Sequence, residues 1–233
     1  REYINDKLSE WIYLDSAGYS IPDPNDDVIL LNDVLKTTNK LSSDRISGFI
    51  QNSSVFGASR QLRLNYGIRT SYWSINKDIV FSPRVSATFA PPNSKRLLFK
   101  FATGLYYQPP FYREMRDLQG QLNTNLKAQK SFQVVLGSEY TFESFGREFK
   151  FSSEVYYKKM SDMVPYKIDN TRLRYHGNNN ANGYAYGLDL RLNGQFVEGA
   201  ESWVSIGILN AQEDINNDFY YNYYNIEGEK IIP

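Results

Sequence analysis

The chain has 233 residues, with 26 lysines and arginines against 26 aspartates and glutamates, one histidine and no cysteine. The formal net charge is +0, and the chain has no run of basic residues that could bind the phosphate backbone of a nucleic acid. Nucleic acid is therefore not expected as a partner. Because His176 is the only histidine and thiols are absent, thiolate zinc sites, cysteine nucleophiles and two-histidine metal motifs are excluded, and neither a metal nor a cofactor is expected.

Apolar and polar residues alternate with a period of two along most of the chain, which predicts β-strands. No stretch reaches the roughly 18 to 20 uncharged apolar residues that a membrane helix requires. About nine strands are expected from this pattern, the first, second and last being the weaker ones. In chain order they cover residues 3–14, 45–56, 61–72, 81–90, 97–108, 131–142, 149–159, 186–194 and 203–212.

Each of the clearer strands has one apolar, ring-rich face and one face of charged and small polar residues. Such two-faced strands imply an antiparallel sheet with different surroundings on its two sides. The small neighbours of the charged residues leave room on that side, which favours a lumen or a docked plug over bulk water. The residues expected to face the lumen or a plug are Arg63, Arg69, Arg84, Lys100, Glu139, Glu154, Asp189 and Arg191, with Lys150 and Lys158 on the same face.

Long and short connections alternate along the chain. Long polar stretches cover residues 15–41, 109–129 and 161–180 and begin again at 213, whereas tight links lie near Gly57, Pro91, Glu143 and Val197. This layout is typical of an outer-membrane β-barrel, and paired rings near strand ends fit an interfacial aromatic girdle. The link at residues 75–78 is the exception, because it is short where a long loop is expected.

Two other classes stay open on the pattern alone. A soluble β-sandwich or secreted binding module would show the same alternation, with one face on a core and the other in solvent. A non-energised structural or diffusive barrel would share the whole layout. An enzyme is not expected, since one histidine supports no Ser/His/Asp series and the strand carboxylates give no reason to prefer catalysis.

Nine strands do not close a bacterial single-chain barrel, which uses an even number. An open edge at each end would template aggregation, so a larger wall or a second chain has to cover it. Residues 1–233 are therefore expected to be part of one outer-membrane β-barrel domain, with the remaining strands and a plug domain outside this chain.

The runs RISGFIQNSSVFG, FSPRVSATFAPP, ATGLYYQPPFYREMRD and NNNANGYAYGLDLRLNG, in this order, resemble the C-terminal barrel portion of TonB-dependent outer-membrane receptors, in particular those of Bacteroidetes. The resemblance covers about residues 45–212. It implies a section of a 22-stranded barrel filled by a plug, a size that is associated with a plugged lumen. It also implies active nutrient uptake in the outer membrane of a Gram-negative bacterium. The implied partners are the TonB complex, reached through the plug, the lipid bilayer and an outer-membrane lipoprotein.

Two long loops hold the candidate ligand-binding residues. In the first, prolines stiffen a cluster of rings and guanidinium groups, which suits a sugar, a catecholate or a carboxylate; the same cluster could instead brace the loop. The second loop carries an arginine, a tyrosine and the histidine before an Asn-rich turn. The candidates are Tyr106, Tyr107, Phe111, Tyr112, Arg113, Arg116, Arg174, Tyr175 and His176.

Two acidic segments, one near each end of the chain, are weaker candidates. Asp214, Asn216 and Asp218 offer hard oxygens for Ca²⁺, but the run lacks the glycine and terminal glutamate of an EF-hand loop. The acidic run at residues 23–27 has the same weakness. Solvated loops are the favoured interpretation of both segments.

Overall fold

A computed structural model describes residues 1–13, 31–57, 61–94, 96–169, 172–219, 223–224 and 230–231. Within these ranges the regular elements are strands, and no helix is long and apolar enough to cross a membrane. All pairings between the strands are antiparallel. The expected all-β, antiparallel class is therefore confirmed, and the sheet does not close into a barrel.

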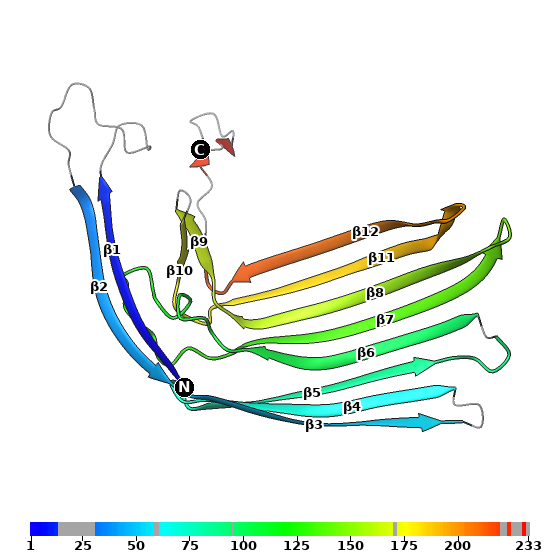
Figure 1. Cartoon of the computed structure of the whole chain (residues 1–233). Coiled ribbons are helices and arrows are strands. Elements are labelled where there is room, and N and C mark those ends of the chain that lie inside the picture. The colour runs from blue at the N-terminus through cyan, green and yellow to red at the C-terminus, as the bar shows by residue number, and fades with distance from the viewer. Residues whose placement is uncertain are drawn as a thin grey trace.

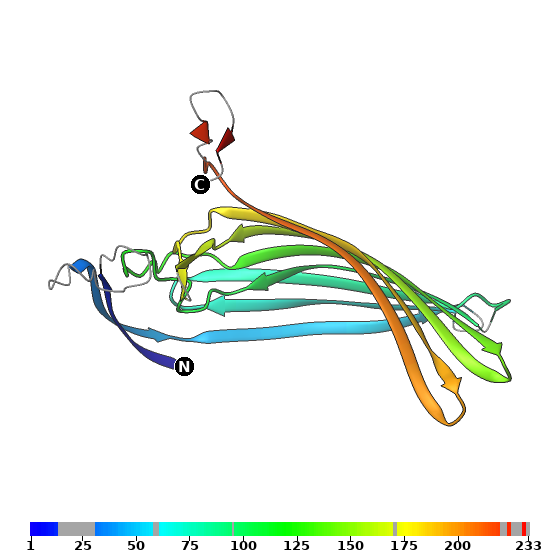
Figure 2. The same cartoon turned by 90° about the horizontal axis from the view of Figure 1, so that it is seen from above.

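Eight strands form one sheet, in the order β12-β11-β8-β7-β6-β5-β4-β3 (Figure 1). Figure 2 shows that this sheet is curved rather than flat. Strands that are adjacent in the main sheet also follow one another along the chain, apart from the short β9 and β10 between β8 and β11, and they alternate in direction. This up-and-down order is the arrangement of a barrel wall. The strands are β3 (Arg45–Phe56), β4 (Leu62–Trp73), β5 (Asp78–Phe89), β6 (Leu97–Gln108), β7 (Gln129–Ser144), β8 (Arg147–Met163), β11 (Ala181–Val197) and β12 (Ala200–Ile215).

All nine expected strands lie on strands of the structure, but the first does not join the main sheet. β1 (Glu2–Tyr13) pairs instead with β2 (Leu31–Ser43), and this hairpin rises beyond one end of the sheet (Figure 1). The expectation that residues 15–41 form a polar loop is wrong from residue 31 onward. β2 was not recognised because its side chains are mostly polar and lack a clear apolar face. Two further expectations of continuous loop, at residues 161–180 and from 213 onward, are corrected by short hairpin strands: β9 (Tyr166–Asp169), β10 (Arg172–Tyr175), β13 (Tyr223–Tyr224) and β14 (Lys230–Ile231).

The strand register gives the sheet one charged face and one apolar face. Arg63 lies opposite Thr88, Arg84 opposite Gly104, and Glu154 opposite Asp189. Followed strand by strand, these pairings place all eight charged residues predicted to share a face on the same side of the sheet. Since successive side chains alternate between faces, a one-residue slip in any pairing would have moved a whole strand's charges to the other side. We call this side the charged face and the opposite side the apolar face.

Charges on neighbouring strands pair along part of the charged face. The Glu139 carboxylate in β7 contacts the Lys100 ammonium from β6 and the Lys150 ammonium from β8, the latter at 2.8 Å. One carboxylate thus links three strands. The Arg191 guanidinium lies over the Trp203 ring of the next strand, 5.0 Å from its centroid. These contacts link β6 to β8 and β11 to β12 on the charged face.

The rings at strand ends divide between the two faces. Alternation places Tyr72, Tyr107 and Tyr157 on the apolar face, as an aromatic girdle requires. Their chain neighbours Trp73 and Tyr106, together with Tyr156, lie on the charged face. The expectation that both members of these three pairs belong to a girdle is therefore wrong, because consecutive residues of a strand point to opposite sides. It holds for the fourth expected pair, Tyr184 and Tyr186, whose rings stack on the apolar face.

The connections fall into two groups at the two ends of the sheet (Figure 1). The short connections between β5 and β6, β7 and β8, and β11 and β12 lie at one end, while the long connections after β6 and β8 lie at the other. From β5 onward the predicted alternation of long and short connections is confirmed. Its predicted exception is also present, since residues 74–77 make a four-residue turn between β4 and β5 at the loop end.

A close approach of two strands at Gly67 gives a stability prediction. A β-carbon at Gly67 would lie 2.6 Å from the Ile50 carbonyl oxygen, whereas at Gly137 the nearest atom would be 3.5 Å away. We expect Gly67→Ala in the full-length protein to lower the free energy of unfolding by about 1 to 3 kcal/mol, because the backbone of β3 has to move. Gly137→Ala is the matched control, with an expected change near zero. Urea unfolding followed by tryptophan fluorescence measures both, and equal losses would contradict the packing described.

Candidate functional site

A small apolar cluster holds the loop end of the sheet together. Trp73, at the end of β4, is 3% exposed and packs with Met115 and Leu126 from the β6–β7 loop and with Val164 after β8. Tyr112 and other partly buried residues surround the cluster. Because Trp73 lies on the charged face, the β6–β7 loop folds over that face rather than outward. We call residues 109–128 and 164–180, where described, the cap.

Asparagine side chains join the two segments of the cap. The Asn123 amide donates to the Gly177 carbonyl at 2.8 Å, and the Asn179 amide donates to the carbonyls of Lys127 and Asp162. The Lys127 backbone N–H donates in return to the Asn179 side-chain oxygen. Amide side chains offer donor and acceptor together, so they satisfy the loop backbone where no strand partner exists. The Asn-rich turn expected only to supply turn conformations therefore also fastens the cap.

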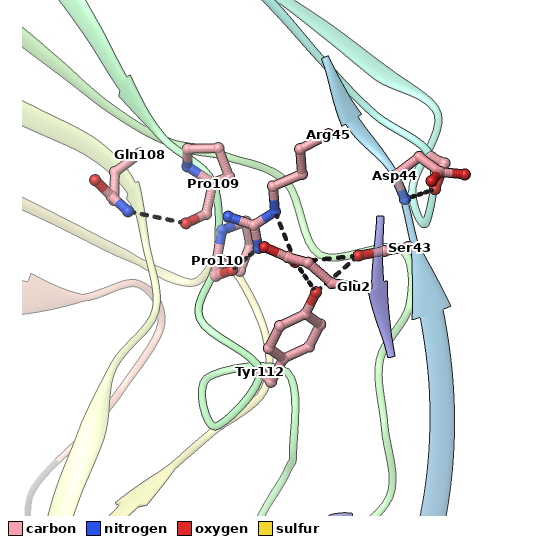
Figure 3. Close-up of polar contacts among 9 residues, drawn as sticks. Glu2, Ser43, Asp44, Arg45, Gln108, Pro109, Pro110 and Tyr112 are labelled. Carbon is pink, nitrogen blue, oxygen red and sulfur yellow. Dashed lines mark hydrogen bonds and ion pairs between the residues drawn. The ribbon is translucent and has the colours of Figure 1, made fainter. Parts of the chain in front are cut away.

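Tyr112 ties the cap to the β1–β2 hairpin (Figure 3). Its hydroxyl donates to the Glu2 carboxylate and lies 2.7 Å from the Ser43 hydroxyl. The Arg45 guanidinium lies 3.7 Å from the same carboxylate and donates to the Pro110 carbonyl at 3.2 Å. It also lies over the rings of Trp73 and Tyr112, with centroid distances of 4.7 and 5.7 Å. Arg45 is thus held by groups from three segments.

The contacts among Glu2, Tyr112 and Arg45 shift the pKa values of Glu2 and Tyr112. The hydrogen bond from Tyr112 is the main cause that lowers the pKa of Glu2, with the Arg45 charge adding to it. Burial is the main cause that raises the pKa of Tyr112, and the hydrogen bond to Glu2 adds to it. The contact therefore needs an ionised carboxyl and a neutral phenol, a combination that holds through the neutral pH range.

A cavity of about 270 Å³ lies between the cap and the charged face of β3, β4 and β5. Three arginines line it, Arg45, Arg69 and Arg84, and Asp78 is the only carboxylate among its lining residues. Serine hydroxyls and the Trp73 indole complete much of the wall. The cavity is therefore polar, basic and rich in hydrogen-bond donors, which suits an anionic group.

The structure separates the nine loop residues that the sequence groups as ligand candidates. Tyr106 lies on the charged face under the Arg84 guanidinium, at 4.4 Å, whereas Tyr107 belongs to the opposite face. Phe111 is 61% exposed, and Arg113 is also exposed. Tyr112 serves the bracing role that was weighed as the alternative. The remaining candidates, half-buried in the cap, are Arg116, Arg174, Tyr175 and His176.

The second loop contributes structure more clearly than a binding surface. Tyr175 packs against the apolar cluster and lies 6.1 Å from the Tyr166 ring, and the His176 backbone N–H donates to the Pro165 carbonyl. Asn216, one of the three calcium candidates, accepts a hydrogen bond from Asn182 and so closes the strand end. Among the described residues no group of three or more acidic or histidine side chains could hold a metal ion. The acidic run at 23–27 lies outside the described residues.

Two residues central to this site, Arg45 and Trp73, were not recognised as candidates from the sequence. Trp73 carried a usable signal, since the alternation that places Arg63 and Arg69 on the charged face also places this ring there. A large apolar ring on a polar strand face indicates that something packs over it. Arg45 carried no such signal, because its partners come from segments distant in sequence.

The family model described as "TonB dependent receptor-like, beta-barrel" matches residues 3–230. A comparison with curated protein sequences gives no match. The match to the family model covers nearly the whole chain, including the β1–β2 hairpin and the cap.

Solved structures share the fold. The outer membrane transporter YddB from Escherichia coli is 13% identical with a TM-score of 0.58, covering 77% of this chain and 26% of that one. The siderophore receptor PirA from Pseudomonas aeruginosa is 14% identical with a TM-score of 0.56, covering 76% and 34%. The RagAB peptide importer is 16% identical with a TM-score of 0.54, covering 80% and 24%. The chain thus spans 24% to 34% of the length of these proteins.

The Tyr112–Glu2 contact predicts a pH-dependent attachment of the cap. Because the pKa of Glu2 is lowered, the contact stabilises the attachment above the ordinary pKa of a carboxyl and is lost as the pH falls through the lowered value. We expect Tyr112→Phe to raise hydrogen exchange in residues 111–126 by roughly two- to tenfold at neutral pH, and to remove its dependence on acid.

Tyr107→Phe is the control, since the Tyr107 hydroxyl has no hydrogen-bond partner among the residues the structure describes. Hydrogen–deuterium exchange with mass spectrometry on the full-length protein measures all three forms. Identical exchange in the wild type and Tyr112→Phe would show that the hydroxyl does not hold the cap.

Proposed function

Because the chain belongs to the TonB-dependent receptor-like β-barrel family, we propose that it forms part of the wall of an outer-membrane receptor that imports a nutrient with energy supplied through TonB. Residues 1–233 are one section of a single barrel domain, and the plug and the remaining strands lie elsewhere in the receptor. The family and its structural neighbours are receptors and transporters rather than enzymes. The lipoprotein partner implied by the sequence resemblance is part of the same proposal.

The uncovered apolar face is the observation that carries this proposal. Leu136, Val155 and Ile206 are 56%, 54% and 61% exposed, on three different strands of one face. In water such an area would drive association, whereas in a bilayer it is the surface that faces lipid. In a complete barrel every strand is hydrogen-bonded to a neighbour on both sides. No backbone N–H or C=O group is then left unpaired in the hydrocarbon core of the membrane. A soluble sandwich would need a second sheet on this face, and the main sheet has none among the described strands.

Two aromatic bands bound the apolar face. Near the short turns, Phe142 and Phe149 stack with ring centroids 5.8 Å apart, and Phe196 lies edge-on to Phe149 at 5.3 Å. Toward the loops, Tyr157 pairs with Tyr186 across the β8–β11 ladder. From Phe149 to Tyr157 the strand has about nine residues, in the range of 9–11 that cross a bilayer. The bands thus lie one membrane thickness apart.

The proposed lumen lies on the other side of the wall. The eight charged residues that share the charged face are proposed to face the plug or the transported solute. The cap covers this face only at the loop end, which we propose to be the extracellular side. Long extracellular loops and short periplasmic turns are the layout of bacterial outer-membrane barrels.

Cysteine labelling tests the membrane orientation. Residues 1–233 contain no cysteine, so Arg113→Cys in the cap and Phe145→Cys in the β7–β8 turn, where Phe145 is 88% exposed, each add one thiol to this section, at opposite ends of β7. The unsubstituted receptor gives the labelling background. We expect a membrane-impermeant maleimide to label Arg113→Cys on intact cells. It should label Phe145→Cys only after the outer membrane is opened. Both sites should react in detergent, and equal labelling of both on intact cells would contradict the orientation.

Growth on single limiting nutrients tests energised import. Strains lacking the receptor, TonB or both are compared on iron chelates, cobalamin, glycans and peptides. We expect loss of the receptor and loss of TonB to slow growth on one shared nutrient, with no further loss in the double mutant. A nutrient that requires the receptor but not TonB would instead indicate a non-energised barrel.

A further inference from the structure

We infer that Arg69 and Arg84, together with the Trp73 indole, form a binding site for an anionic group of the transported solute, a carboxylate or a phosphate. The inference rests on the proposed function for the identity of the ligand as cargo. The site is the cavity of about 270 Å³ under the cap, on the charged face of β4 and β5.

Charge balance separates this region from the rest of the charged face. Between β6 and β8 the lysines share the Glu139 carboxylate, and beneath the cap Arg45 is paired with Glu2. Neither Arg69 nor Arg84 has an ion pair with any residue that the structure describes. They come from diagonal positions on neighbouring strands, because Arg69 pairs with Ser82 and Gly67 with Arg84. Two like charges on one side of adjacent strands repel, so an anion between them is favourable.

The Arg84 side chain is already placed for binding. Gly104 lies opposite it in the ladder, and a β-carbon there would lie 3.0 Å from the Arg84 Cγ. The missing side chain leaves space for the arginine stem, and the guanidinium lies 4.4 Å from the Tyr106 ring centroid. A stacked guanidinium keeps its planar edge of N–H donors available and loses little rotamer freedom on binding. The Arg69 guanidinium lies 3.5 Å from the Ser47 hydroxyl.

An unpartnered donor in the same wall is an independent sign of a ligand. Trp73 is 3% exposed and lines the cavity, and its buried indole N–H has no hydrogen-bond acceptor among the described residues. An indole nitrogen can only donate, so it needs an acceptor oxygen. Carboxylate and phosphate groups are pure acceptors with several oxygens. They can therefore accept hydrogen bonds from the guanidinium groups that line the cavity.

The cavity also opens toward the proposed transport route. Arg69, Arg84, Ser47 and Ser82 line both this cavity and a larger hollow of about 970 Å³ further along the same wall. The two arginines therefore stand between the cap and the middle of the wall. An anionic group leaving the cap would meet them before it reaches the deeper hollow.

Binding of small anions to the purified full-length receptor tests the site. Isothermal titration calorimetry at low ionic strength compares citrate, inorganic phosphate and uncharged mannitol. We expect citrate or phosphate to bind and mannitol not to bind. Arg69→Gln and Arg84→Gln should each weaken that binding by about tenfold or more, as expected for loss of a charged hydrogen-bond donor. The preferred anion distinguishes a carboxylate from a phosphate source.

Arg63→Gln is the matched control, because Arg63 lies on the same face of β4 but does not line the cavity. It should bind the anion like the wild type, and all variants should show the heat-modifiable migration of a folded barrel. Absence of anion binding by the wild type, or equal binding by all variants, would overturn the inference. The first outcome is also expected if acidic plug residues fill the site. Growth without TonB dependence would contradict the proposed function alone, since binding is measured on the purified protein.

Discussion

The antiparallel ladder of the eight-stranded sheet fixes almost everything else in this molecule. Each pairing holds its register over most of its length, so the alternation of side chains is transmitted from β3 to β12 without a change of face. A single slip would have placed arginines among the rings of the apolar face. Because the ladder does not slip, the apolar residues form a continuous surface and the charged residues form another. The cavity exists because Arg69 and Arg84 come to lie on the same side of two strands.

The charged face uses two different solutions for its charges. Between β6 and β8, the Glu139 carboxylate forms ion pairs with lysines from both neighbouring strands, so these lysines have a partner within the wall. Beneath the cap, Arg45 is neutralised by Glu2 from the β1–β2 hairpin, while Arg69 and Arg84 keep their charges beside hydroxyl groups. Exposed ion pairs contribute little to stability. The difference between these two regions of the charged face therefore has little effect on folding stability. It matters more for which charged groups each region attracts.

Much of the fold could be predicted from the sequence, because period-two alternation is a local signal. The strands from 61–72 to 186–194 and the shared face of Arg63 through Arg191 follow from it directly. β2 could not be found this way, since its polar residues lack an apolar face and its partner β1 is joined through a long connection. The cap depends on contacts between residues far apart in sequence, such as Trp73 with Leu126 and Val164. Tyr112 illustrates the limit: its ring in a proline-rich loop was predicted to contact a ligand or to brace the loop, and only its position beside Glu2 favours bracing.

Only some of the bonds that hold the cap depend on pH. This difference distinguishes the residues that hold the cap in place from the residues that are available to a ligand. The cap segments are joined to each other by buried apolar side chains and by asparagine amides, none of which titrates. Tyr112 joins the cap to the β1–β2 hairpin through the Ser43 hydroxyl, which does not titrate, and through the Glu2 carboxylate, which does. Acid therefore loosens the cap from the hairpin without dissolving the cap itself. The cavity that Arg69 and Arg84 line is built by the main sheet and the cap, and none of its described lining residues comes from the hairpin.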